Sequence, residues 1–114
     1  MILNDTQCNE SIVVANEQLI ITNINKKTLE IFGYNEEELL NKNVKILMTE
    51  KTSLKHDRYI NNYYSGKKPE IIGTQGKKVL GKTKNGDILN LFLSIGESYH
   101  NNNKKIFTAT FAII

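Results

Sequence analysis

Histidine is the residue type in this sequence best suited to ligate a metal or to carry a proton, and it occurs twice, at His56 and His100. His56 is followed by Tyr59, Ile60 and Tyr63, a spacing that places all four side chains on one face of a helix. His100 belongs to a polar run, YHNNNKK, which predicts a solvated loop. A histidine on an apolar helix face either packs in a core or points at a ligand. A neutral imidazole is a good ligand for iron.

No other residues in the sequence form a recognisable catalytic set. There is no HExxH motif, no Cys/His cluster with zinc spacing, and a single cysteine, Cys8, which excludes an internal disulfide. The run GKKVLGKT, residues 76–83, formally fits the phosphate-loop pattern G-x-x-x-x-G-K-T. A phosphate loop needs a long helix after it, whereas a turn and an alternating strand follow here, so we interpret the match as accidental. We therefore predict a protein that is not an enzyme.

The size and composition predict one globular domain. The chain has 114 residues, of which 39% are apolar and 24% charged, and a net charge of +3. That charge is too small to indicate nucleic-acid binding by itself. No apolar run is long enough to span a bilayer, and no signal peptide opens the chain. We expect a cytoplasmic protein with neither nucleic acid nor membrane as a partner.

The first elements predicted along the chain are a β-hairpin and a short helix. Residues 1–10 are mostly polar and are expected to form a flexible flank. Residues 11–15 and 19–22 are apolar runs rich in branched side chains and separated by a polar turn, which is typical of a hairpin. Residues 25–32 predict a short helix that ends at Gly33.

Three further helical segments are predicted before the chain returns to strands. Asn35 is an N-cap candidate, and Glu38 lies three residues later, as a capping box requires. Asn41 is expected to end this helix in the left-handed conformation, which asparagine tolerates. A helical turn is expected at residues 43–48. The longest helix is expected at residues 53–64, where a Ser-Gly pair stops it.

The second half of the sequence predicts three strands. Residues 77–83 and 87–97 flank a turn that contains Asn85-Gly86, and this pair predicts a type I′ hairpin because both turn positions need positive φ. Apolar residues alternate with polar ones along the second of these strands, so that one face is buried: Leu89, Leu91, Leu93 and Ile95. Residues 106–114 predict the last strand.

The order β-β, short helices, β-β-β predicts an α+β fold with a five-stranded antiparallel sheet and short helices packed on one face. Two runs in this order, ITNINKKTLEIFGYNEEELLNKNVKILM and GKTKNGDILNLFLSIGE, resemble the PAS domain. The resemblance covers residues 11–114. It implies a PAS sensory or signalling module that regulates or assembles a larger signalling protein. The pocket between sheet and helices in this family holds haem, flavin, a small metabolite or nothing. The expected partners are an effector domain in a larger chain and a second copy or another PAS domain.

Within the family, comparison with two cofactor-binding groups limits which cofactor is expected. Flavin-based light sensors carry a reactive cysteine where this chain has Val44, so a flavin photoadduct is excluded. The runs NVKILM, HDRYINNY, PEIIG and LSIGE are similar to the haem-binding PAS domain of FixL-type oxygen sensors. That similarity implies His56 as the proximal ligand of haem b, Leu93 and Ile95 on the distal side, and Lys77 as the basic residue that responds to bound oxygen. The expected pocket residues are His56, Ile60, Tyr63, Ile71, Ile72, Lys77, Leu93 and Ile95.

Two positions depart from the FixL-type pattern. Asn62 and Glu70 stand where that group has an arginine and a histidine that hold the haem propionates. Replacing a cation with a carboxylate removes a charge-assisted hydrogen bond. Three alternatives therefore remain open: a PAS module with a small-molecule pocket or a PAS–PAS dimer interface, a haem-based oxygen sensor, and a ligand-free interaction module.

Overall fold

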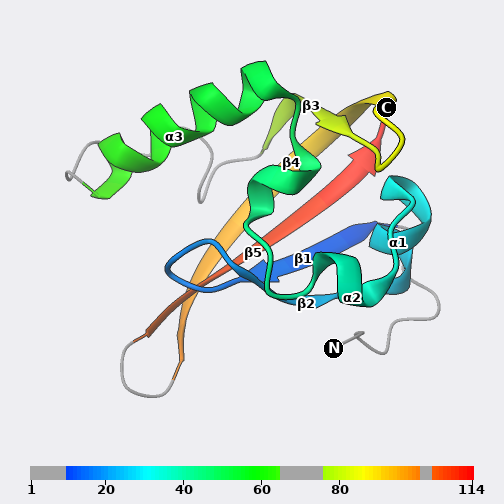
Figure 1. Cartoon of the computed structure of the whole chain (residues 1–114). Coiled ribbons are helices and arrows are strands. Elements are labelled where there is room, and N and C mark those ends of the chain that lie inside the picture. Colours follow the sequence, from blue (N-terminus) through cyan, green and yellow to red (C-terminus); the bar gives the residue numbers. More distant parts are fainter. Residues whose placement is uncertain (1–9, 65–75, 101–103) are drawn as a thin grey trace.

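The computed structural model describes residues 10–64, 76–100 and 104–114 (Figure 1). Nearly all of the predicted N-terminal flank therefore lies outside the described residues. The elements in chain order are β1 (Ser11–Ala15), β2 (Ile21–Ile24), α1 (Lys26–Phe32), α2 (Glu36–Leu39), the 3₁₀ turn η1 (Val44–Leu47), α3 (Glu50–Tyr64), β3 (Lys77–Lys82), β4 (Ile88–His100) and β5 (Lys104–Ile113).

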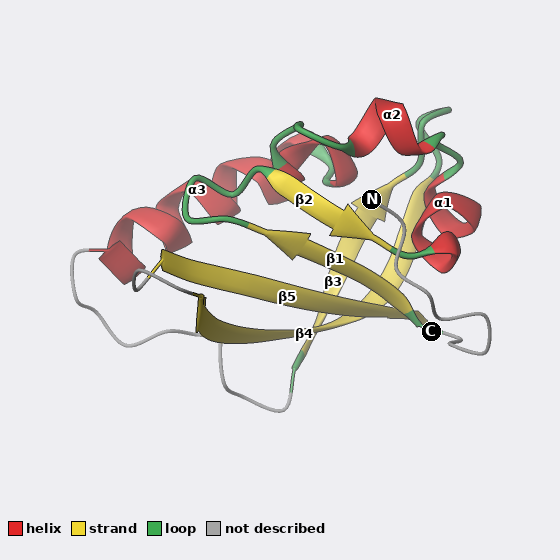
Figure 2. Cartoon of the chain, turned by 90° about the horizontal axis from the view of Figure 1, so that it is seen from below, coloured by secondary structure: helices red, strands yellow, loops and turns green. Residues whose placement is uncertain are grey.

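The strands form a five-stranded sheet in the order β2-β1-β5-β4-β3, and every neighbouring pair is antiparallel. Figure 2 shows α2 and α3 on the same side of this sheet. The predicted α+β architecture is confirmed. Because the first and last strands of the chain pair in the middle of the sheet, side chains from β1 and β5 lie side by side on its inner face.

The predicted helix ends are confirmed at several points. Gly33 ends α1 in the left-handed conformation (φ 79°), and its N–H donates to the Leu29 carbonyl at 2.9 Å. Glu38 accepts a hydrogen bond from the Asn35 N–H at 2.9 Å, which satisfies a donor at the start of α2. Asn41 has a φ of 67°, as predicted for the residue that turns the chain away from α2.

The hairpin between β3 and β4 forms as predicted, but the prediction of a type I′ turn is wrong. Gly86 has a positive φ of 93°, and Asn85 does not. The Gly86 N–H donates to the Thr83 carbonyl at 3.0 Å, and the Thr83 N–H donates to the Asp87 carbonyl at 2.9 Å. This is a three-residue loop, which needs one left-handed residue rather than two, and glycine supplies it.

Other boundaries also differ from the predictions: β2, for example, spans Ile21–Ile24 rather than residues 19–22. Helix α3 begins at Glu50, three residues earlier than expected, because the Thr49 hydroxyl accepts a hydrogen bond from the Thr52 N–H and caps the helix. His100 lies on β4, opposite Lys104 on β5, rather than in a loop, because the ladder between these strands continues past their apolar residues. Most of the phosphate-loop lookalike forms β3, so its glycine Gly81 lies within a strand.

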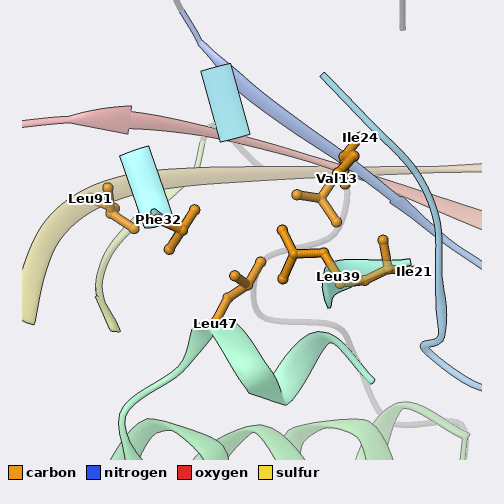
Figure 3. Packing of buried hydrophobic residues seen from close by; sticks show 7 residues of the cluster. All are labelled: Val13, Ile21, Ile24, Phe32, Leu39, Leu47 and Leu91. Carbon is orange, nitrogen blue, oxygen red and sulfur yellow. The ribbon is translucent and has the colours of Figure 1, made fainter. Parts of the chain in front are cut away.

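The core lies between the sheet and the first helical segments. Figure 3 shows its side chains converging from β1, β2, α1, α2, η1 and β4: Val13, Ile21, Ile24, Phe32, Leu39, Leu47 and Leu91. The Phe32 ring also packs edge-to-face on Phe111 of β5, with the ring centroids 5.8 Å apart. This packing holds α1 against β5.

A buried polar cluster attaches α1 to β1. Asn25, the N-cap of α1, accepts hydrogen bonds through Oδ1 from the Ile12 N–H at 3.0 Å and the Thr28 N–H at 3.1 Å. Its Nδ2 donates to the Glu10 carbonyl at 2.8 Å. The hydroxyls of Ser11 and Thr28 lie 2.7 Å apart. These groups lose their contact with water on folding and have protein partners instead, as buried polar groups require.

Candidate functional site

A cavity of about 420 Å³ lies between the inner face of the sheet and the segment formed by η1 and α3. This volume falls within the range of small-molecule sites in proteins. Figure 1 shows α3 on the opposite side of the molecule from α1. The cavity adjoins the core, because Val13 and Leu47 belong to both.

The floor of the cavity is built from inward-facing residues of three adjacent strands. Leu93 and Ile95 of β4 are two residues apart and face the same side of the sheet. Ile95 lies opposite Ala109 of β5, and Ala109 lies opposite Val13 of β1. Phe107 extends this row. Because strand pairing fixes the register, these apolar side chains form one continuous surface.

The opposite wall comes from the end of η1 and from α3. Met48, Thr52 and Ile60 line the cavity on this side. Met48 forms an isolated bridge with Gly81 of β3, which fixes the start of α3 beside that strand. An exposed ion pair between Lys45 Nζ and Asp57 Oδ1, at 3.1 Å, links η1 to the middle of α3. The wall is therefore attached to the sheet at its beginning.

Leu19, in the turn between β1 and β2, also lines the cavity and has a φ of 64°. A branched apolar residue rarely adopts this conformation. The Asn16 side chain holds it there, because Asn16 Oδ1 accepts hydrogen bonds from the N–H groups of Gln18 at 3.0 Å and Ile20 at 3.1 Å. The turn thus places an apolar side chain, rather than a polar one, at the cavity edge.

The charged residues at the cavity are lysines. Lys51, Lys77 and Lys78 line it, and none of its described lining residues is acidic. Lys77 is two residues from Val79 and four from Gly81, so its side chain is on the inner side of β3 with theirs. It is also exposed to solvent. Lys77 therefore lies at the mouth of the cavity.

The structure brings together four of the eight pocket residues expected from the sequence: Ile60, Lys77, Leu93 and Ile95. His56 and Tyr63 lie on α3, but their side chains are outside the described residues. Ile71 and Ile72 lie in the segment 65–75, which is also outside them. Iron ligation by His56 therefore stays a prediction.

Sequence reasoning missed the contributions of β1, η1 and β5 to the cavity: Val13, Ala15, Leu47, Met48, Phe107, Ala109 and Phe111. Alternation of apolar residues in the first and last strands shows which of them face inward. It does not show that these two strands are neighbours. The strand order supplied that information.

In the described parts of the chain, no group of three or more His, Cys, Asp and Glu residues is placed to hold a metal ion. No helix among the described residues is long and apolar enough to cross a bilayer.

A model of the PAS fold matches residues 5–106. The sensor protein FixL of Bradyrhizobium diazoefficiens is 36% identical over 88 residues, which are 77% of this chain and 17% of that protein. A probable serine/threonine-protein kinase of Dictyostelium discoideum is 33% identical over 87 residues, which are 76% of this chain and 6% of the kinase. The chain thus spans less than a fifth of either relative, and both relatives are larger proteins.

Solved structures of PAS domains have the same fold. One from a Colwellia psychrerythraea protein superposes with a TM-score of 0.75 at 19% identity and covers 94% of this chain and 87% of its own. The PAS domain of an HTR-like protein from Haloarcula marismortui gives 0.74 at 15% identity and covers 95% and 84%. At these identities the likeness establishes the fold and not the ligand.

Proposed function

The chain belongs to the PAS family and is a sensory or signalling module, and we propose that it senses a small molecule bound in the cavity between α3 and the sheet. The observation that carries this proposal is the cavity of about 420 Å³ with its apolar floor of Leu93, Ile95 and Ala109. An apolar ligand bound there would gain dispersion contacts with these side chains. The role proposed is sensory rather than catalytic.

The strands offer a route from the ligand to a partner. Each residue of the cavity floor alternates with one on the outer face: Leu93 lies beside Phe92 on β4, and Ala109 beside Thr110 on β5. A ligand that shifts the floor also shifts the outer face of the same strands. An effector or a second PAS domain in contact with that face would then respond. The relatives support this arrangement, since the matched segment is a small part of each larger protein.

Dye binding tests the cavity directly. Nile red, a neutral apolar dye, should bind the wild-type protein with a blue-shifted, enhanced fluorescence. Ala109→Leu should weaken this binding because the added carbon atoms occupy the cavity. Ala112→Leu on the same strand is the matched control, because Ala112 lies opposite Phe92 on the outer face. Dye binding that is equal in both variants and the wild type would contradict the proposal.

Haem b is the more specific ligand within this proposal. The apolar side chains of Leu93, Ile95 and Ile60 suit the faces of a porphyrin, and Lys77 at the mouth suits a propionate, so the described residues fit the group. In this version His56 would hold the iron, and Leu93 and Ile95 would limit which gases enter the site. When bound, haem would supply a gas-binding iron. The FixL sensor protein among the relatives supports this choice.

A haem titration tests this version. Purified protein supplied with haem should develop a strong Soret absorbance that is lost in His56→Ala. His100→Ala is the matched control, because His100 lies at the far end of β4 and should leave the spectrum unchanged. If the wild-type protein cannot be reconstituted, the haem version is overturned, and the dye experiment still decides whether the cavity takes another ligand.

Self-association is the second candidate function. Two large apolar side chains, Ile88 (62%) and Phe92 (36%), are exposed on the outer face of β4. Leu80 (41%) and Ile114 (60%) are exposed beside them and also border the cavity. Leu80 lies opposite Asn90, and the Ile114 N–H donates to the Asn90 carbonyl, so these residues lie close together. Such a patch favours burial against an apolar partner. The occupant proposed is a second copy of this chain.

Sedimentation velocity tests self-association. The wild-type protein should form a dimer at high concentration, and Ile88→Lys should shift it toward monomer because a charge would enter the interface. Leu54→Lys, at an exposed position (66%) on α3, is the matched control. A wild-type protein that remains monomeric at high concentration would rule this candidate out.

A further inference from the structure

We propose that the ligand of the cavity is an apolar molecule with one anionic group, of the carboxylate class, and that Lys77 binds that group at the mouth. This inference rests on the proposed function, because it requires that the cavity take a ligand. It goes beyond it by naming the ligand chemistry and the residue that recognises it.

Lys77 faces the inner side of β3. The register of β3 on β4 is regular from Lys77 to Lys82, so alternation along β3 is not interrupted. Gly81 faces inward, because a Cβ there would meet Leu91 and Phe32 of the core. Lys77 is four residues away and therefore has the same orientation. A lysine thus lies on the face of the strand that is otherwise apolar.

Lys77 lies beside apolar residues of the cavity floor. Its Cα partner on β4 is Leu93, which is 8% exposed, and Ile95 follows on the same face. A ligand whose apolar body lies on Leu93 and Ile95 therefore extends toward Lys77. Lys51 of α3 is a second positive residue that lines the cavity, and none of the described lining residues is acidic.

The sign of this charge selects the ligand. An anionic group gains a charge-assisted hydrogen bond from the Lys77 ammonium, whereas a cationic group meets repulsion. A neutral hydroxyl in the same place forms a weaker hydrogen bond. A carboxylate at one end of an apolar body satisfies both parts of the site. The same apolar cavity without the lysine would favour the neutral ligand.

A competition experiment isolates the contribution of the anionic group. Dodecanoate and dodecanol have the same chain length and differ in the charge of the head group. Each is titrated at pH 8 against bound Nile red in the wild-type protein, in Lys77→Met and in Lys77→Arg. The quantity compared between variants is the ratio of the dodecanoate affinity to the dodecanol affinity. Lys82→Met is the matched control, because Lys82 is on the same strand and does not line the cavity.

We expect Lys77→Met to lower this ratio by about fivefold, the upper range for an exposed ion pair, while Lys77→Arg and Lys82→Met leave it close to the wild-type value. Added salt should lower the ratio in the wild type and have little effect in Lys77→Met. Circular dichroism confirms that each variant is folded, and Nile red binding confirms that its cavity remains.

The possible failures are distinguishable. If Nile red binds and Ala109→Leu weakens it, but the ratio is the same in wild type and Lys77→Met, the inference is wrong and the proposed function stands. If Lys51→Met lowers the ratio and Lys77→Met does not, the assignment to Lys77 is overturned. If the wild-type protein binds no Nile red and no dodecanoate, the proposed function fails and the inference fails with it.

Discussion

Asn25 shows how a single side chain can determine the position of an element. It is fully buried, and its carboxamide contacts the backbone of both β1 and α1. The carbonyl oxygen accepts from two N–H groups, and the amide nitrogen donates to a third backbone group. A hydrophobic residue of similar size could fill the space, but it would leave these backbone groups without partners in the interior. The sequence predicted Asn25 only as the first residue of the short helix at residues 25–32.

The first prediction concerns this residue. Asn25→Ala should lower the free energy of unfolding by about 2–4 kcal/mol, because the N–H groups of Ile12 and Thr28 lose their acceptor. Equilibrium denaturation with urea measures the change. Asn90→Ala, at an exposed position on β4, should change stability by less than about 0.5 kcal/mol. Equal effects in the two variants would show that the Asn25 hydrogen bonds do not contribute as argued.

The second prediction concerns pH. A hydrogen bond from the Lys84 ammonium, then one from the Asn35 N–H, lowers the pKa of Glu38 below its ordinary value of 4.5. Because the pKa is lower in the folded state, the stabilisation is present above pH 4.5 and is lost as the pH falls through the folded pKa. Glu38→Gln should therefore lower the melting temperature at pH 7, and the difference from wild type should shrink as the pH falls below 4.5.

Thermal denaturation monitored by circular dichroism at several pH values measures this difference. Glu37→Gln is the matched control, since Glu37 lies in the same helical turn and is exposed. A Glu38→Gln effect of the same size at pH 7 and pH 3 would contradict the linkage of α2 to the β3–β4 turn through Lys84.

The strand β3 shows how one element serves both the core and the site. At Gly81 the strand passes close to the core: an added Cβ would lie 2.7 Å from Leu91 Cδ1 and 3.2 Å from Phe32 Cε1. At Lys77, four residues earlier, the same face of the strand borders the cavity. The change from glycine to lysine along one face thus follows the change from close packing to open space.

The third prediction follows from this geometry. Gly81→Ala should lower the free energy of unfolding by about 1–3 kcal/mol, because the methyl group overpacks the contact between β3 and Phe32. Gly96→Ala on β4 is the matched control, because no atom lies within 4 Å of the added Cβ. It should be neutral or slightly stabilising. The two variants are compared by urea denaturation, and the reverse order of stabilities would contradict the packing described for β3.

The same elements show what the sequence could predict. Local signals succeeded: Gly33 ends α1, Asn41 adopts positive φ, and the alternation of Leu91 and Leu93 marks the inner face of β4. These depend on neighbours along the chain. The turn at Asn85-Gly86 was predicted with the wrong geometry, because loop length decides which residue needs positive φ, and a dipeptide does not specify that length.

At the scale of the molecule, the fold class was predictable and the cavity was predictable only in part. The order of strands and helices along the chain led to the α+β sheet and to the PAS resemblance. The cavity depends on the separation between α3 and the sheet, and on β1 and β5 lying side by side. Neither feature can be predicted from the spacing of residues that are close together in the sequence. Leu93 and Ile95 were therefore found from the sequence, while Val13 and Ala109 were not. The role of His56 stays a prediction.

The sheet also separates two proposed roles by its faces. The inner face provides the apolar floor of the cavity, and the outer face carries exposed apolar residues such as Ile88. Because alternate residues of the same strands form both faces, binding on one side is connected to association on the other by the backbone. This arrangement is what a sensory module needs if its output is a change in contacts with a partner.

The most direct measurement of the central claim, that the cavity binds a small apolar ligand, is a nuclear Overhauser experiment on methyl-labelled protein saturated with dodecanoate. Contacts are expected from the ligand methylene protons to the methyl groups of Leu93, Ile95 and Ile60, and none to those of Ile88 on the outer face. Contacts restricted to Ile88, or no contacts at saturation, would contradict this claim.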